Sequence, residues 1–445
     1  MEKRISKRAV NGLSRREFLT MTTLATAGLV TGCAINPVTG KSQIMMINES
    51  EEITIDHQQS PHQLSSDYGA TRDVTLGNYI RATGTRMAAL THRPGMPYAF
   101  YCVNANYINA YAFPGGTIAC TRGILLEMDN EAELAALLGH ELGHVNARHT
   151  ASRVSKSQLS SIAVSGLSIL ASATVGSDAG SLAGQLGQLG AGAFLASYSR
   201  DNERQADGLG MEYMTRAGYS PQGMVDLMDM LNTMNQQKTG ITQLLFSTHP
   251  MSTERYTTAV QKAQKDYSRF AGNSVYRERY MDSIAGLRKI KDAVKAQQNG
   301  EEAMGRKAYG DAEALFKQSL NQVPNDYTGL LLMAKCQLIQ GNHTEAASYV
   351  QQAKRVNPKE AQAYHISGIT CIRSKQYSAA YTEFSTYQSL LPGNPNTTFY
   401  QGLALEGMNQ LERAASAYNT YLKSVSSGDQ AKYAYNRLKS WGYIR

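Results

Sequence analysis

Small, aromatic and proline residues recur at a fixed interval in the last third of the chain. The interval is 34 residues, and three positions keep their character at each step. These positions are Ala312, Ala346, Ala380 and Ala414; Phe316, Val350, Phe384 and Tyr418; and Pro324, Pro358 and Pro392. Such a period is typical of stacked helical hairpins, in which small residues lie where helices cross and larger ones fill the space between them. We expect each hairpin to end at its proline.

The 34-residue period resembles that of the tetratricopeptide repeat. We predict four repeats between about 297 and 427, followed by a closing helix that reaches Trp441. The resemblance implies an all-α solenoid with a concave surface that binds segments of client or partner proteins. The alternative interpretation is an array that only packs against the preceding domain.

Two short apolar runs in the first part of the chain, YAFYCVN and GTIACT, predict neighbouring strands. Cys102 and Cys120 lie in these runs, where they could form a disulfide or remain two buried thiols. The same question applies to Cys336 and Cys371. No CxxC pattern exists, so the sequence does not indicate a cysteine-bound metal.

The alanine- and leucine-rich segment EAELAALLGHELGHVNARH predicts a helix, which Asn130 and Glu133 would begin as a capping box. His140 and His144 are four residues apart, so they share one face of this helix and could bind one metal ion. Glu141 points about 100° away and could act as general base on a metal-bound water. The alternative interpretation is a surface helix with two solvated histidines.

A zinc hydrolase has a third protein ligand and leaves the fourth position to water. His149 would lie roughly 140° round the helix from His144, so we do not expect it to be that ligand. Glu203 and Asp207 are again four residues apart on a predicted helix. One carboxylate could bind the metal and the other could orient a ligand histidine. The alternative is solvent-facing charge.

HELGH, followed about 60 residues later by SRDNERQAD, resembles the HtpX- and BepA-type zinc endopeptidases, a gluzincin group with an ExxxD third-ligand helix. Three further stretches match this family in the expected order: NPVTGK at 36–41, NAYAFPGGTIACTRG at 109–123 and STHPMSTER at 247–255. The resemblance implies an α+β zincin-like domain, mostly helical, with a small sheet whose edge strand binds substrate.

The same resemblance assigns roles to individual residues. It implies one Zn²⁺ per chain, held by His140, His144 and Glu203. Glu141 matches the general base and Asp207 the carboxylate behind the ligands. The resemblance also makes two residues of the STHPMSTER stretch, His249 and Arg255, candidates for transition-state stabilisation or for regulation. His249 could either restrain the enzyme by filling the water position or donate a hydrogen bond in the transition state.

The net charge of +8 does not indicate a nucleic-acid-binding protein. Residues 1–32 hold six Lys/Arg and two Asp/Glu, so they account for +4 of this charge. The remaining positive residues are scattered, and we expect no nucleic-acid partner.

The first residues resemble an export signal. Arg15 and Arg16 match a twin-arginine motif, and Val30-Thr31-Gly32-Cys33 matches a lipoprotein cleavage box. Cys33 would then carry the lipid anchor in the periplasm. Residue 34 is alanine rather than the aspartate that often retains lipoproteins in the inner membrane, so the resemblance favours the outer membrane. The alternatives are a general secretory signal and a plain core cysteine.

We therefore predict a signal segment at 1–32, a zinc metallopeptidase domain at 33–270, a helical linker at 271–296 and tetratricopeptide repeats at 297–445. The glycine-rich stretch 163–197 is either a flap near membrane or substrate or a small-residue hairpin packed inside the domain. The predicted function is a zinc-dependent endopeptidase of the bacterial cell envelope that cleaves unfolded or misassembled proteins. The alternative is a lipid-anchored repeat chaperone or adaptor with little peptidase activity.

Overall fold

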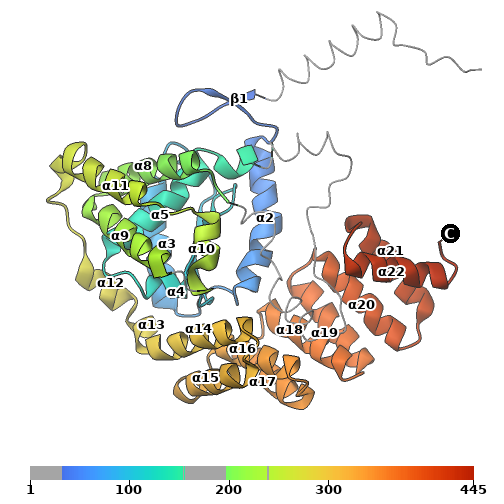
Figure 1. Ribbon diagram of the computed structural model, residues 1–445. Coiled ribbons are helices and arrows are strands. Elements are labelled where there is room, and N and C mark those ends of the chain that lie inside the picture. The colour runs from blue at the N-terminus through green and yellow to red at the C-terminus, as the bar shows by residue number, and fades with distance from the viewer. Residues whose placement is uncertain (1–32, 154, 156–196, 238–239, 445) are drawn as a thin grey trace, which may run out of the picture.

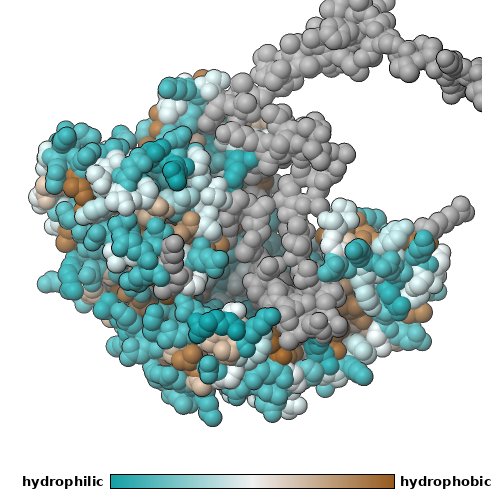
Figure 2. Space-filling model, viewed as in Figure 1, coloured by the Kyte–Doolittle hydropathy of each residue, from teal (hydrophilic) through white to brown (hydrophobic). Residues whose placement is uncertain are grey.

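The computed structural model describes residues 33–153, 155, 197–237 and 240–444. A mostly helical domain surrounds a small sheet, and an arc of helical hairpins follows it in the chain (Figure 1). The visible surface of both parts is mostly hydrophilic, with small scattered hydrophobic spots (Figure 2). The predicted signal segment and nearly all of the glycine-rich stretch lie outside the described residues. Within the described ranges, no helix is both long and apolar enough to cross a lipid bilayer.

The central sheet has three short strands in the order β3-β5-β4. β3 (Ala99–Val103) runs parallel to β5 (Thr117–Thr121), and β4 (Ala110–Ala112) pairs with β5 in the antiparallel sense, so the two runs are neighbouring strands as predicted. Cys102 is the register partner of Cys120, but both are buried free thiols. Cys336 and Cys371 are also free. β4 lies at the edge of the described sheet.

The helices of this domain pack around the sheet, and a short hairpin precedes them. The hairpin consists of β1 (Cys33–Ile35) and β2 (Ser42–Ile44). The helices are α2 (Glu49–Ser66), α3 (Val74–Ala88), α4 (Arg122–Leu125), α5 (Glu131–Asn146), α8 (Arg200–Arg216), α9 (Gln222–Gln237), α10 (Gln243–Thr248), α11 (Thr253–Lys265), α12 (Arg277–Ser283) and α13 (Ala285–Lys289).

Helix α5 is buried along its whole length. Its N-cap is Asn130, whose side chain accepts a hydrogen bond from the Glu133 backbone N–H, as predicted. The returning half of the capping box differs, because the Glu133 carboxylate accepts from the backbone N–H of Asp129 and the side-chain amide of Asn130 rather than from the N-cap backbone N–H. The helix ends at Asn146, and Arg148 then adopts a left-handed conformation with φ of 56°. The chain therefore turns before His149.

Two glycines let α5 and α8 approach closely. A Cβ on Gly139 would lie 2.8 Å from the carbonyl oxygen of Gly210, and one on Gly143 would lie 3.0 Å from the Cα of Ala206. Any larger residue would push the helices apart. The glycines of GHELGH thus allow the metal-ligand candidates of the two helices to meet.

The array consists of four helical hairpins and a closing helix, and it confirms the predicted repeat fold. The hairpins are α14 (Lys291–Gly305) with α15 (Tyr309–Gln322), α16 (Tyr327–Ile339) with α17 (His343–Val356), α18 (Ala361–Arg373) with α19 (Tyr377–Leu390), and α20 (Pro395–Gly407) with α21 (Leu411–Ser424). The closing helix is α22 (Asp429–Ser440). The periodic alanines, Ala312, Ala346, Ala380 and Ala414, are fully buried, and so are Phe316, Val350, Phe384 and Tyr418. Helix α14 runs across the predicted boundary at 296/297.

The first hairpins of the array contact the loops of the sheet. Arg122, the first residue of α4, forms an ion pair with Asp326, at 2.8 Å between Nη1 and Oδ1. The Thr328 hydroxyl donates to the backbone oxygen of Asn104 at 3.0 Å. The array thus packs against the first domain through polar contacts and through a shared hydrophobic cluster, in which Tyr111 and Phe113 join Leu331 of the array.

Candidate metal centre

The two histidines of α5 lie on one face of the helix, and their Nε2 atoms are 3.0 Å apart. Both side chains are buried, with 5% of His140 and 1% of His144 exposed. This burial rules out the alternative of two solvated histidines.

Glu203 reaches the same point from the first turn of α8. Its Oε1 lies 3.4 Å from His144 Nε2 and its Oε2 lies 3.6 Å from His140 Nε2. Burial alone would raise the pKa of Glu203, but the charges of His249 and His140 and a hydrogen bond to His144 hold it well below its usual value. The carboxylate is therefore ionised and available to a cation.

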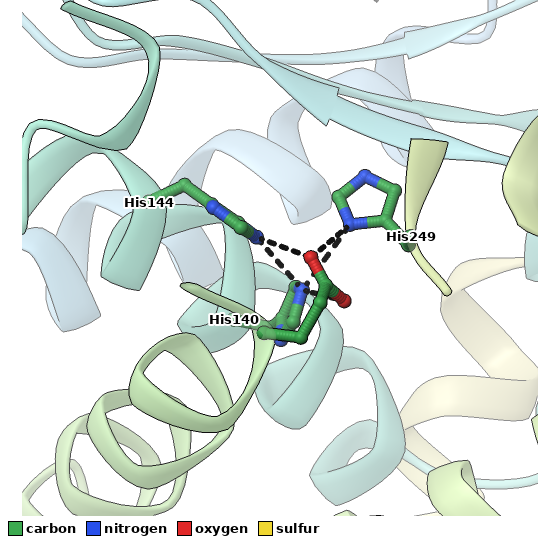
Figure 3. A group of neighbouring side chains, drawn as sticks. His140, His144 and His249 are labelled. Carbon is green, nitrogen blue, oxygen red and sulfur yellow. Dashed lines mark hydrogen bonds and ion pairs between the residues drawn. The ribbon is translucent and has the colours of Figure 1, made fainter. Parts of the chain in front are cut away.

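His249 completes the group from the loop after α10 (Figure 3). Its Nδ1 lies 3.2 Å from Glu203 Oε1 and 3.4 Å from His140 Nε2. One ligand atom from each of His140, His144, Glu203 and His249 lies within 4.8 Å of all the others.

Glu141 lies beside this group without belonging to it. Its side chain is 1% exposed, and its Oε2 has no hydrogen-bond partner. Its Oε1 is 3.9 Å from His249 Nε2. Burial raises the pKa of Glu141, although the charges of His249 and His140 oppose the increase. A carboxylate with an unpaired oxygen at this position can accept a proton from a water between it and the ligands.

Asp207 and Arg255 support the ligands from behind. Asp207 Oδ1 accepts a hydrogen bond from His140 Nδ1 at 2.9 Å. Arg255 binds both carboxylate oxygens of Asp207 at 2.7 Å, and its Nη1 lies 2.8 Å from Glu203 Oε2. The contact with Glu203 is an ion pair without good hydrogen-bond alignment. Asp207 thus lies where the resemblance puts it, and Arg255 faces the carboxylates.

The donor set fits a divalent cation. Three imidazoles and an ionised carboxylate converge in a buried site, and Glu141 leaves an oxygen unpaired beside them. Nitrogen and oxygen donors in fourfold arrangement suit zinc among the common metals.

Sequence reasoning missed three residues around His144. We expected His149 on a continuous helix, but α5 ends first, and His149 Nδ1 lies 2.9 Å from His144 Nδ1. His149 Nε2 in turn lies 3.0 Å from Gln205 Oε1. The ring of Tyr198 stacks on His144, with centroids 3.8 Å apart. No spacing rule predicts these contacts, because they depend on the turn at Arg148.

Comparison with known families agrees with this geometry. Residues 76–263 match the model of peptidase family M48, and residues 303–366 match that of the tetratricopeptide repeat. The metal centre described above lies inside the first match.

Several curated relatives match this chain over part or most of its length. The beta-barrel assembly-enhancing protease of Yersinia pestis is 28% identical over 373 residues, which is 78% of this chain and 76% of that protein. Its Escherichia coli K12 counterpart is 28% identical over 46% of this chain and 42% of that protein. The metalloprotease YcaL of E. coli K12 is 28% identical over 52% of this chain and 87% of that protein. The match thus spans less than half of the E. coli assembly-enhancing protease.

Proposed function

We propose that this metalloendopeptidase, which combines a peptidase family M48 domain with tetratricopeptide repeats, is a zinc enzyme of the bacterial cell envelope that cleaves unfolded or misassembled proteins. The observation that carries the proposal is the convergence of His140, His144 and Glu203 beside the unpaired carboxylate of Glu141. Relatives named beta-barrel assembly-enhancing protease support the envelope role. Their names also favour a peptidase over the alternative of a repeat adaptor.

The chemistry follows from the positions of these side chains. Bound zinc would supply a Lewis acid that polarises the scissile carbonyl and lowers the pKa of the attacking water. Glu141 takes the proton of that water on its carboxylate and passes it to the leaving amine. Asp207 accepts the Nδ1–H of His140 and so keeps Nε2 free for the metal.

The edge of the sheet is the proposed place for the substrate backbone. β4 lies at the edge of the described sheet, and its residues belong to the NAYAFPGG stretch. An extended peptide can add to such an edge through main-chain hydrogen bonds, a mode that reads little sequence. Because folded proteins rarely expose a free extended segment, this mode selects unfolded clients. The array would bind clients or partners and add selectivity.

The position of His249 supports its proposed restraint of the enzyme. Its Nδ1 approaches the same point as the three zinc ligands (Figure 3). A fourth ligand there, the third imidazole, occupies the place that a catalytic site leaves to water. Displacement of the loop would then be needed for cleavage. The rival role, a hydrogen-bond donor in the transition state, uses the same proximity, so the two must be separated by experiment.

The cellular location of the protein is part of the proposal. We propose that the mature chain begins at a lipidated Cys33 in the periplasm, anchored to the outer membrane. The basis is the VTGC box and the twin arginines, Arg15 and Arg16. Mass spectrometry of the mature N-terminus tests the anchor, and an unmodified chain that starts elsewhere would refute it. Lysine at both arginines should stop export by the twin-arginine route.

The decisive test of the activity is the isosteric change Glu141→Gln. We expect cleavage of an unfolded protein by the zinc-loaded enzyme to fall by roughly 10²- to 10⁴-fold, because the general base is lost. Zinc content should not change. Glu127→Gln, at an exposed position just before α5, is the matched control. Equal, low cleavage by wild type and Glu141→Gln would support the adaptor instead.

A further inference from the structure

The two ligand histidines of α5 have different partners behind them. His140 directs its Nδ1 to a carboxylate, Asp207, which Arg255 also binds. His144 directs its Nδ1 to a second imidazole, His149, at 2.9 Å. His149 is 4% exposed, and its other nitrogen meets the Gln205 amide at 3.0 Å. Helix α8 thus supports both ligands, directly through Asp207 and indirectly through Gln205.

The directions of these hydrogen bonds are fixed by the metal-binding nitrogen. The Nε2 atoms of His140 and His144 face each other and Glu203, so a metal would bind them there. An imidazole that binds a metal through Nε2 carries its proton on Nδ1. His144 must therefore donate from Nδ1, and His149 must accept on its own Nδ1.

The rest of the chain of hydrogen bonds agrees with this assignment. If His149 accepts on Nδ1, its proton is on Nε2, which needs an acceptor. The atom it faces is the Oε1 of Gln205, an acceptor. Every donor thus meets an acceptor from His144 to Gln205 with no charged group involved.

We propose that His149 and Gln205 form a neutral hydrogen-bond relay that fixes the tautomer and ring orientation of His144 and so makes His149 a positioning residue of the metal centre. The inference rests on the proposed zinc site. Tyr198 packs on the face of the His144 ring, and its hydroxyl lies 2.9 Å from the Thr150 hydroxyl. A carboxylate behind a ligand histidine makes it a stronger donor than a neutral acceptor does. The relay therefore orients His144 without adding negative charge to the site.

Two substitutions at His149, similar to each other in shape, separate hydrogen bonding from packing. Asparagine keeps an acceptor close to the position of Nδ1, whereas leucine has the shape of asparagine without an acceptor. We expect His149→Leu to weaken zinc binding by about 10- to 100-fold, the usual loss for a partner behind a metal ligand. His149→Asn should stay within about threefold of wild type, because the bond from His144 is retained. The measurement is the zinc dissociation constant by competition with a chelator.

A second pair of variants, at Gln205, tests the relay even if His149→Leu fails to fold. Gln205 is half-buried, so Gln205→Met and Gln205→Glu should fold. Methionine removes the last acceptor and should weaken zinc binding by several-fold, whereas glutamate keeps an acceptor oxygen and should not. The Co²⁺-substituted proteins should show shifted d–d bands in the Leu and Met variants only.

The outcomes separate the relay from the site itself. Equal zinc affinity in His149→Leu and wild type, or equal loss in the Leu and Asn variants, would overturn the relay. Wild-type protein that binds no zinc would overturn the metal centre and with it the proposed function. Tight wild-type binding with all four variants unchanged would leave the proposed function intact and remove only the relay.

Discussion

Helix α5 and the second helix of each array hairpin are similar in length but differ sharply in burial. These second helices, α15, α17, α19 and α21, are called the outer helices. All 16 residues of α5 are buried, whereas α17, with 14 residues, buries only Ala346, Val350 and Ala353. The outer helices repeat one simple contact with their neighbours. α5 meets the sheet, α3, α8 and α9 at once. The difference implies that a substitution in the array lowers stability only near the substituted repeat, while a substitution near α5 also affects the metal centre.

The largest expected effect is Glu203→Ala, which removes a carboxylate that three histidines and Arg255 share. We expect the purified variant to lose nearly all of its zinc and its cleavage activity. Asp207→Ala should weaken zinc binding by about 10- to 100-fold, because it removes a partner of His140 and Arg255 but no ligand. Metal analysis of both variants is the measurement. Full zinc retention in Glu203→Ala would remove Glu203 from the ligands.

The array should respond differently to the loss of a core side chain. Phe384 is fully buried and stacks on Tyr400, with ring centroids 5.2 Å apart. We expect Phe384→Ala to cost about 3–5 kcal/mol of local stability and to lower hydrogen-exchange protection in the neighbouring repeats. The zinc dissociation constant should not change.

The control for this prediction is Leu390→Ala on the same helix, where the side chain is 39% exposed. It should leave both protection and zinc affinity near wild type. If Phe384→Ala also weakened zinc binding, the array and the metal centre would unfold together, and the contrast between local and long-range effects would fail.

The next expected effect is a change in cleavage rate at His249, and its sign depends on which of the two proposed roles the residue has. If the loop restrains the enzyme, His249→Ala should cleave an unfolded protein faster, by about tenfold for each 1.4 kcal/mol of loop preference removed. If His249 stabilises the transition state, turnover should fall by roughly 100-fold or more with zinc retained. Rates and zinc content of the same preparation decide between these roles.

The contrast between the two regions also explains what could be predicted from the sequence. The array depends on contacts between neighbours in the chain, so a 34-residue period was enough to predict its hairpins. The ligand candidates of α5 and α8 followed from spacing on a helix and from a family resemblance. His249 was named by resemblance, but spacing alone could not place its loop.

His149 shows the limit of spacing rules. We excluded it as a ligand from an angle on a helix that in fact ends at Asn146. The turn depends on Arg148, which binds Glu52 and the backbone oxygen of Ile47, about one hundred residues earlier in the chain. Such a contact has no local signal. The same holds for the shifted capping box. The carboxylate of Glu133 accepts from the backbone N–H of Asp129 instead of that of Asn130, and the sequence does not distinguish these two adjacent donors.

The first turn of α5 holds two glutamates with opposite electrostatic surroundings. Burial opposes ionisation of Glu131, but Arg279 and Tyr219 bind it and lower its pKa. Glu133 has no such cation. Burial raises the pKa of Glu133 to about 7, and the charges of Asp226 and Asp129 add to the shift. One glutamate thus stabilises the helix as an anion, and the other is favoured in its protonated form.

The smallest predicted effect follows from this difference. The pKa of Glu133 is higher in the folded chain, about 7, than the value of about 4.3 in an unfolded one. The folded state therefore binds the extra proton, and its contribution to stability is present at pH 4 and is lost as pH rises to 8. Glu133→Gln, which is neutral at every pH, should raise the thermal midpoint at pH 8 and leave it near wild type at pH 4. Glu127→Gln, exposed and nearby, should do neither. A destabilised Glu133→Gln at pH 8 would mean that the bonds from Asp129 and the helix N-terminus outweigh burial, and that α5 tolerates a buried anion there as well as it does at Glu131.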